Sequence, residues 1–206
     1  MTGDVILAPG LWLPASTLWL LAARLQRAGY APHLFSYSGR GSFDANVERL
    51  ARFARETVDS RPAHFIGHSL GGVLVLDTLN RHADIPAASA LLLGSPARGS
   101  LAGRRFGAGR IGRWMMGDAA SCWEARNPRW TRPAPLGVIA GSVAFGLARI
   151  AGGRLPGLND GVVCVEETPV QGMADAAQVR VAHSLLVTSS SVARLAERFL
   201  RSGSFA

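Results

Sequence analysis

One stretch decides the fold of this chain: Gly67-His68-Ser69-Leu70-Gly71-Gly72. It follows a short apolar run, His64–Gly67, and opens a helical pattern over Leu70–Leu79. A serine in G-x-S-x-G between a strand and a helix is typical of a tight turn that holds a nucleophilic hydroxyl above a sheet. The helix N-terminus would favour the anion that forms during attack. The alternative is a glycine-rich turn whose serine merely caps the helix.

Short apolar runs recur on both sides of this stretch and alternate with helical patterns. Because they are flanked by Gly, Pro or Ser and are largely apolar, we expect them to be strands covered on both faces. This alternation predicts an α/β fold with a mainly parallel sheet of about six strands flanked by helices. Active sites in such sheets lie at the carboxyl ends of the strands. The predicted strands are Val5–Ala8, His33–Tyr37, His64–Gly67, Ala90–Gly94, Leu136–Gly141 and Val179–Ala182.

Helical patterns fill the intervals between the predicted strands. The first begins with Ser16 as a candidate N-cap and ends before Gly29, where a C-terminal glycine is common. The second carries Asp44 early, as a cap or a first-turn acid. The predicted helices are Ser16–Ala28, Phe43–Thr57, Leu70–Leu79 and Ser191–Leu200.

Length and composition predict one domain over residues 1–206, since a chain of 206 residues that is 48% hydrophobic can bury a sizeable core. All 22 basic residues are arginine, against 14 acids, which gives a net charge of +8. Such a charge suits an anionic partner, or it reflects genomic base composition. The arginines are spread along the chain with no run typical of a nucleic-acid arm, so we expect no nucleic-acid binding.

Cysteine and histidine spacing gives no sign of a metal site or a disulfide scaffold. The two cysteines, Cys122 and Cys164, form no Cys-x-x-Cys or Cys/His group, and we expect no metal and no other cofactor. Whether the two thiols are free or paired stays open. The N-terminus lacks the features of a secretory signal, and no apolar run is long enough to span a bilayer, so we expect a cytoplasmic protein.

Residues 97–135 interrupt the alternation of strands and helices. The segment is rich in Gly, Arg and Trp, and loops of this length are often functional. It is either a small cap or flap over the site or a long connection with one helix. Its tryptophans and arginines also suit contact with a membrane surface, although a covered loop with solvated arginines explains them as well.

A serine hydroxyl needs a base that removes its proton, and the position of His183 suits that role. It directly follows the last predicted strand, at the carboxyl edge of the sheet. His33, His64, His68 and His82 are placed at strand starts, inside the turn or at a helix end. The alternative for His183 is a hydrogen-bonded loop histidine without a chemical role.

The third member of such a site is a carboxylate between serine and histidine in chain order, which orients the imidazole. Asp160, in Leu158-Asn159-Asp160-Gly161-Val162-Val163, lies in a loop upstream of the last predicted strand. The alternative is that this Asn-Asp-Gly sequence is only a turn. Asp175 is the reserve candidate for the acid.

Acyl transfer also needs backbone N–H donors for the developing oxyanion. Leu70, the residue after the serine, supplies one of them. The second is expected from Leu11, in the loop after the first predicted strand, with Trp12 as the fallback. Trp12 and Leu185 are expected to line the substrate site, together with their apolar neighbours. Apolar side chains at this mouth predict a lipid-like or aryl ester as substrate.

These segments together resemble the α/β-hydrolase superfamily, and within it the compact bacterial lipases and esterases with little or no lid. The serine motif, Leu93-Gly94-Ser95-Pro96, the Asp160 segment and Ala182-His183-Ser184-Leu185-Leu186 carry the resemblance. The resemblance implies an ester hydrolase with a Ser69-Asp160-His183 triad. One departure is Pro9-Gly10, where the family usually has His-Gly. Two alternatives stay open: an acyltransferase or thioesterase with the same triad, and a binding protein without turnover.

Overall fold

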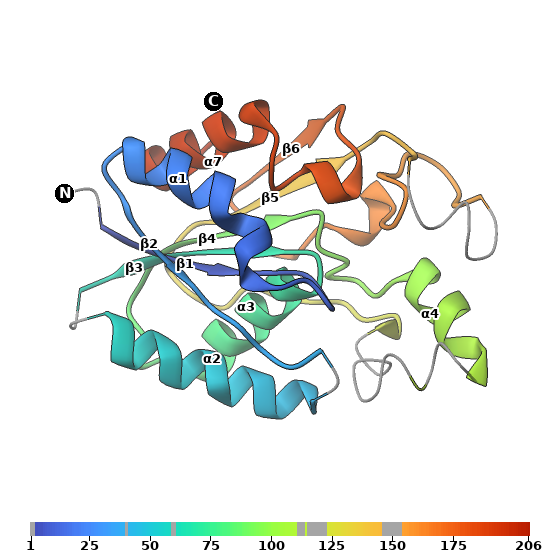
Figure 1. The fold of residues 1–206 in the computed structure, drawn as a ribbon, viewed down its shortest axis with the longest axis horizontal. Coiled ribbons are helices and arrows are strands. Elements are labelled where there is room, and N and C mark those ends of the chain that lie inside the picture. Colours follow the sequence, from blue (N-terminus) through green and yellow to red (C-terminus); the bar gives the residue numbers. More distant parts are fainter. Residues whose placement is uncertain (1–2, 40, 59–60, 111–113, 115–122, 146–153) are drawn as a thin grey trace.

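The structure is a computed structural model that describes residues 3–39, 41–58, 61–110, 114, 123–145 and 154–206. Its centre is a six-stranded sheet in the order β2-β1-β3-β4-β5-β6, and every neighbouring pair of strands is parallel (Figure 1). This confirms the predicted α/β class and the number of strands. The strands are β1 (Asp4–Ala8), β2 (Ala31–Leu34), β3 (Ala63–His68), β4 (Ala87–Leu93), β5 (Leu136–Gly141) and β6 (Asp175–Val179).

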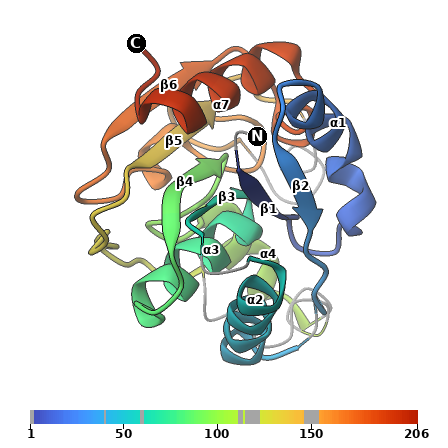
Figure 2. The same ribbon diagram turned by 90° about the vertical axis from the view of Figure 1, so that its left-hand side faces the viewer.

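Helices cover the sheet on both faces. On one face lie α1 (Trp19–Arg27) and α7 (Ser190–Ser202), and on the other lie α2 (Phe43–Thr57) and α3 (Leu70–Arg81), as Figures 1 and 2 show from two directions. Each face has its own apolar core between helices and sheet. Burial of apolar side chains on both faces is the main driving force for this arrangement.

Local sequence explains most element ends. Helix α2 spans the predicted residues, with Asp44 in its first turn, and the side chain of Ser42 caps it by accepting a hydrogen bond from the amide of Ala45. Helix α1 differs from the prediction, because Ser16 lies inside a short 3-10 helix, η1 (Ala15–Leu18), and caps nothing. The predicted glycine after α1 is confirmed, since Gly29 has a φ of +93°.

The last strand was predicted in the wrong place. It covers Asp175–Val179, whereas Val179–Ala182 was predicted from its apolar residues. The side chains of β6 alternate between more and less exposed positions, because this strand is the edge of the sheet. An edge strand that contains polar residues does not form an apolar run, so the apolar pattern did not predict it here. Strands β2 and β4 also begin two or three residues earlier than predicted.

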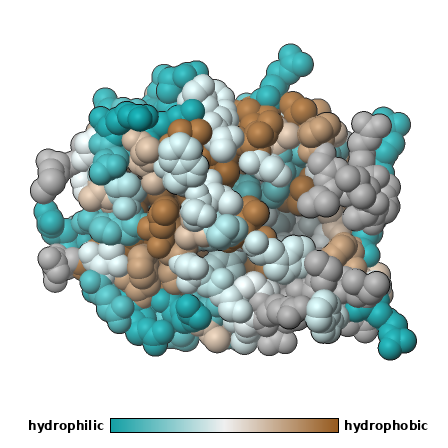
Figure 3. Space-filling model, viewed as in Figure 1, coloured by the Kyte–Doolittle hydropathy of each residue, from teal (hydrophilic) through white to brown (hydrophobic). Residues whose placement is uncertain are grey.

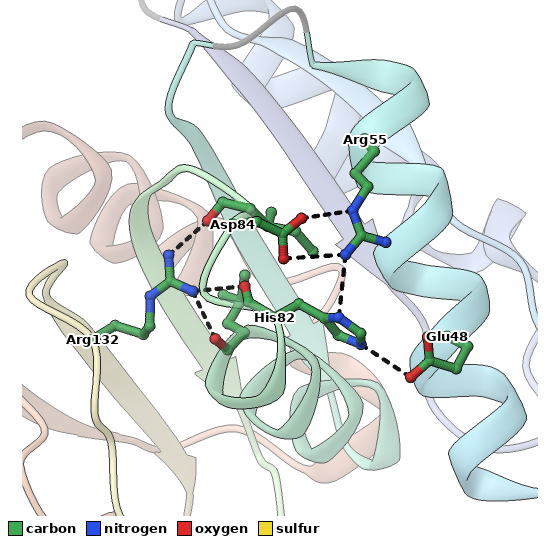
Figure 4. A network of polar contacts seen from close by, with 7 residues as sticks. Glu48, Arg55, His82, Asp84 and Arg132 are labelled. Carbon is green, nitrogen blue, oxygen red and sulfur yellow. Dashed lines mark hydrogen bonds and ion pairs between the residues drawn. The ribbon is translucent and has the colours of Figure 1, made fainter.

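The segment predicted as a cap or a connection, residues 97–135, contains helix α4 (Leu101–Ala108), and part of it lies outside the described residues. Its last part is tied to the body of the molecule by Arg132, whose guanidinium donates to the backbone oxygens of Leu79, His82 and Ile85 (Figure 4). In the same network Arg55 forms a bidentate ion pair with Asp84. These contacts lie at the end of α3 that precedes β4, away from the serine at its start.

Candidate active site

The predicted turn at Ser69 is present and has an unusual backbone. Strand β3 ends at His68, α3 begins at Leu70, and Ser69 between them has φ 53° and ψ −125°. Among the described residues only Ser69 and Trp12 are non-glycine residues with positive φ. Backbone strain of this kind persists where the surrounding structure enforces it, commonly at active sites. The Ser69 side chain makes no capping hydrogen bond, so the capping alternative does not hold.

Two glycines make the turn sterically feasible. A Cβ at Gly67 would lie 2.3 Å from the Cα of Gly72. A Cβ at Gly71 would lie 2.2 Å from the backbone oxygen of Pro9, in the loop after β1. The second contact shows that the turn and the Pro9-Gly10 loop pack directly on each other.

Asp160 and His183 form a buried pair over the neighbouring strand ends. Asp160 Oδ2 lies 2.7 Å from His183 Nδ1, and their side chains are 1% and 8% exposed. The other carboxylate oxygen accepts from the amides of Val162 and Val163, at 3.0 and 2.7 Å. Separately, the backbone amide of His183 donates to the backbone carbonyl oxygen of Asp160 at 2.9 Å. The amides of Val162 and Val163 and the Nδ1–H of His183 stabilise the negative charge of the carboxylate, which in turn fixes the imidazole orientation.

The pair sits beside the serine turn. The ring of His183 lies 4.8 Å, centroid to centroid, from the ring of His68, which directly precedes Ser69. A Cβ at Gly94, just after β4, would lie 3.1 Å from Asp160 Oδ2 and 3.3 Å from His183 Nδ1. No hydrogen bond within the described part of the chain engages Nε2 of His183. This nitrogen is therefore available to a proton donor such as a serine hydroxyl.

The loop after β1, which carries the predicted donor Leu11, lies against the serine. A Cβ at Gly10 would be 3.2 Å from Ser69 Cβ. The amide of Leu11 donates no hydrogen bond to any described residue, and the amide of Leu70 lies in the first turn of α3, where N–H groups lack helical partners. The Tyr37 hydroxyl donates to the Pro9 oxygen at 3.0 Å and holds the loop.

The two residues predicted to line a substrate site reach the surface near these groups. Trp12 is 46% exposed and Leu185 is 55% exposed. The ring of Trp12 packs edge-to-face on Phe106 of α4, with 5.9 Å between centroids. Helix α4 therefore flanks the Gly10–Trp12 loop.

Asp175, the reserve acid, lies elsewhere. It begins β6, and its Oδ2 accepts from the Ser204 hydroxyl and the Phe205 amide, at 2.8 and 2.7 Å. These hydrogen bonds lower the pKa of the Asp175 carboxyl. Its place at the start of the strand removes it from the carboxyl edge of the sheet.

Sequence reasoning missed three residues of the site. Tyr37 bonds to Pro9 and Phe106 packs on Trp12, both in the loop after β1, and His68 contacts His183. Tyr37 could have been found, because it ends a predicted strand at the carboxyl edge. Nothing in the local sequence marks Phe106 or the contact of His68, since both depend on distant parts of the chain.

The described residues also bear on three other features: a metal site, a membrane-spanning helix and a disulfide bond. Among the residues that the structure describes, no group of three or more His, Cys, Asp or Glu side chains is placed to hold a metal ion. Within the same residues, no helix has the length and apolarity needed to cross a membrane. Cys164 is a free, buried thiol, and Cys122 lies outside the described residues.

Comparison with known proteins gives the family. A model described as the alpha/beta hydrolase family matches residues 5–201. The chain belongs to this family. No curated protein matches the sequence of this alpha/beta hydrolase.

Solved structures share the fold of this alpha/beta hydrolase at low sequence identity. The mature form of a Bacillus licheniformis lipase has a TM-score of 0.75 and 16% identity, with 96% of this chain and 91% of the lipase covered. A metagenomic carboxyl esterase has a TM-score of 0.65 and 18% identity, with coverage of 97% and 73%. A thioesterase from the prodiginine biosynthetic pathway of Streptomyces coelicolor has a TM-score of 0.61 and 15% identity, with 97% of this chain and 84% of the thioesterase covered. Identities this low establish similarity of fold alone.

Proposed function

We propose that this alpha/beta hydrolase is a serine esterase in which Ser69, His183 and Asp160 form the catalytic triad. The observation that carries the proposal is the buried hydrogen bond from His183 Nδ1 to Asp160, which leaves Nε2 beside the serine turn. A histidine held in this way has the tautomer that accepts a proton from a serine hydroxyl.

The reaction would proceed through an acyl-enzyme. Ser69 Oγ bonds to the acyl carbon while its proton moves to Nε2 of His183. That proton then passes to the leaving alcohol oxygen as the ester C–O bond breaks. Water, deprotonated by His183, attacks the acyl carbon, releases the acid and restores the Ser69 hydroxyl. Every proton is returned, and no metal or organic cofactor takes part in these steps.

Two backbone amides would stabilise the oxyanion. Leu70 lies next to Ser69 at the start of α3, and Leu11 lies in the loop that packs on the turn. Donors of this type act in a preorganised site, and loss of one costs about 10²–10³ in kcat. Pro9 stands where the family usually has histidine, and proline lacks only its own N–H. The proposed donor is the N–H of Leu11, so this departure leaves the donor in place.

An apolar ester fits the surroundings of the site. Six large apolar side chains are exposed on segments that lie at the carboxyl edge or flank the Asp160–His183 pair: Trp12, Leu13, Val143, Phe145, Leu158 and Leu185. On the face drawn in Figure 3, apolar residues reach the surface in several places between hydrophilic ones. Apolar contact with an acyl chain or an aryl group would contribute about 25 cal/mol for each Å² removed from water.

The test is a series of nitrophenyl esters, from acetate to laurate, assayed with the wild type and with Ser69→Ala. We expect hydrolysis that favours the longer or aryl esters and falls on the order of 10⁴-fold or more in Ser69→Ala. Wild type that turns over no ester in the series contradicts the proposal. Faster turnover of thioesters, or preferential transfer to an added alcohol, would favour the thioesterase or acyltransferase alternative.

Membrane contact through residues 97–135 is a separate part of the proposal. Trp114 is exposed in this segment, and tryptophan and arginine side chains suit a lipid–water interface. Co-sedimentation of Ser69→Ala protein with vesicles should rise with the anionic lipid content. Co-sedimentation that does not change with the anionic lipid content would refute this contact.

A further inference from the structure

His68 is a buried histidine that the proposed reaction does not use. It ends β3, directly before Ser69, and is 1% exposed. Its Nε2 lies 3.2 Å from the backbone oxygen of His183. Since a carbonyl oxygen can only accept, Nε2 of His68 must carry the proton and donate it.

This hydrogen bond joins the serine turn to the loop of the base. The two residues are 115 positions apart in the chain, and the bond fixes the backbone of His183 relative to the residue next to Ser69. Asp160 holds the amide and the Nδ1 of the same histidine. Asp160 therefore holds His183 on the acid's side, and His68 joins the same residue to the serine turn.

The other ring nitrogen of His68 indicates that burying this histidine lowers the stability of the fold. Nδ1 is buried and has no hydrogen-bond partner among the described residues. A buried polar atom without a partner is destabilising, and an apolar side chain of similar size would avoid that loss. Burial and the neighbouring His183 also lower the pKa of His68 to about 3, so the ring stays neutral near pH 7.

We infer that His68 is a positioning residue whose Nε2–H, bound to the His183 oxygen, sets the distance between the His183 imidazole and the Ser69 hydroxyl. The inference rests on the proposed function, because it assigns His183 and Ser69 as base and nucleophile. Misplacement of a catalytic group by about 1 Å can cost 10²-fold in rate. Loss of this hydrogen bond should therefore lower kcat and leave KM nearly unchanged.

Two amide variants separate the hydrogen bond from the shape of the ring. In His68→Gln the side-chain nitrogen lies near the position of Nε2 and can still donate to His183. In His68→Asn it lies near the position of Nδ1 and cannot reach. We expect His68→Gln to keep kcat within about threefold of wild type and His68→Asn to lose on the order of 10²-fold, with similar KM.

Each outcome of this comparison decides the inference. Equal kcat in both variants and wild type, or equal loss in both folded variants, would overturn it. So would failure of both variants to fold, since the role would then be structural. A wild type that hydrolyses no ester and takes up no fluorophosphonate refutes the proposed function itself, and that result comes from the wild-type arm alone.

Nitrogen NMR of ¹⁵N-histidine-labelled protein tests the contact without any substrate. Spectra of wild type and His68→Gln assign the His68 ring nitrogens by difference. The inference predicts a neutral ring protonated at Nε2 throughout the pH range from about 5 to 8. A ring protonated at Nδ1, or one that titrates in this range, would overturn it.

Discussion

Substitution of Gly71 by alanine tests how the serine turn and the Gly10–Trp12 loop depend on each other. The new Cβ would lie 2.2 Å from the Pro9 oxygen and 2.4 Å from the Ala8 oxygen, whereas ordinary contacts begin near 3.4 Å. The loop must therefore move by roughly 1 Å, because α3 cannot move without distorting the turn.

The displacement should affect both activity and stability. Moving the Leu11 amide away from the oxyanion should lower kcat by about 10²–10³. Overpacking typically costs about 1–3 kcal/mol of stability. For a chain of this length each kcal/mol lowers Tm by about 2–4 °C, so we expect a loss of about 2–12 °C.

The assays are kcat and KM for the preferred nitrophenyl ester, with Tm from calorimetry. Gly109→Ala is the matched control, because a Cβ there would lie 3.9 Å from its nearest neighbour, the Phe106 oxygen, and φ is −80°. The control should behave as wild type. A folded Gly71→Ala protein with the kcat of wild type would refute the packing argument.

Three further predictions follow from buried groups. Asp160→Asn should lower kcat about 10⁴-fold with little change in KM, because Asn favours the wrong His183 tautomer; an undiminished kcat would exclude Asp160 as the orienting acid. The depressed pKa of His68 means that, between about pH 6.5 and 3, the unfolded chain binds a proton there that the folded chain does not. The free energy of unfolding should therefore fall as pH decreases through this range, and less steeply in His68→Gln; identical slopes in urea titrations would contradict this. Burial raises the pKa of the Cys164 thiol to about 11, so iodoacetamide at pH 7.5 should modify Cys164 only after unfolding, and rapid modification of the folded protein would show otherwise.

Much of the framework could be predicted because it depends on local patterns. Apolar periodicity located α2 residue for residue, and the motif around Ser69 placed the turn between a strand and a helix. The chain order of nucleophile, acid and base pointed to Asp160 and His183, which the structure brings within hydrogen-bond distance. Their catalytic roles stay a prediction.

The parts that could not be predicted depend on contacts across the sheet. The edge strand β6 exposes alternate side chains, so its polar residues resemble a loop. The bond from His68 to His183 spans 115 residues, and the packing of Trp12 on Phe106 joins the loop after β1 to helix α4. No local periodicity encodes contacts of this kind, because they arise only when the strands are ordered side by side.

The most direct measurement of the central claim is the site and rate of fluorophosphonate labelling, followed by peptide mass spectrometry. The account predicts one adduct, on Ser69, that forms rapidly in wild type and far more slowly in His183→Ala and Asp160→Asn. An adduct on another residue, or labelling of Ser69 that is equally fast without His183, would contradict it.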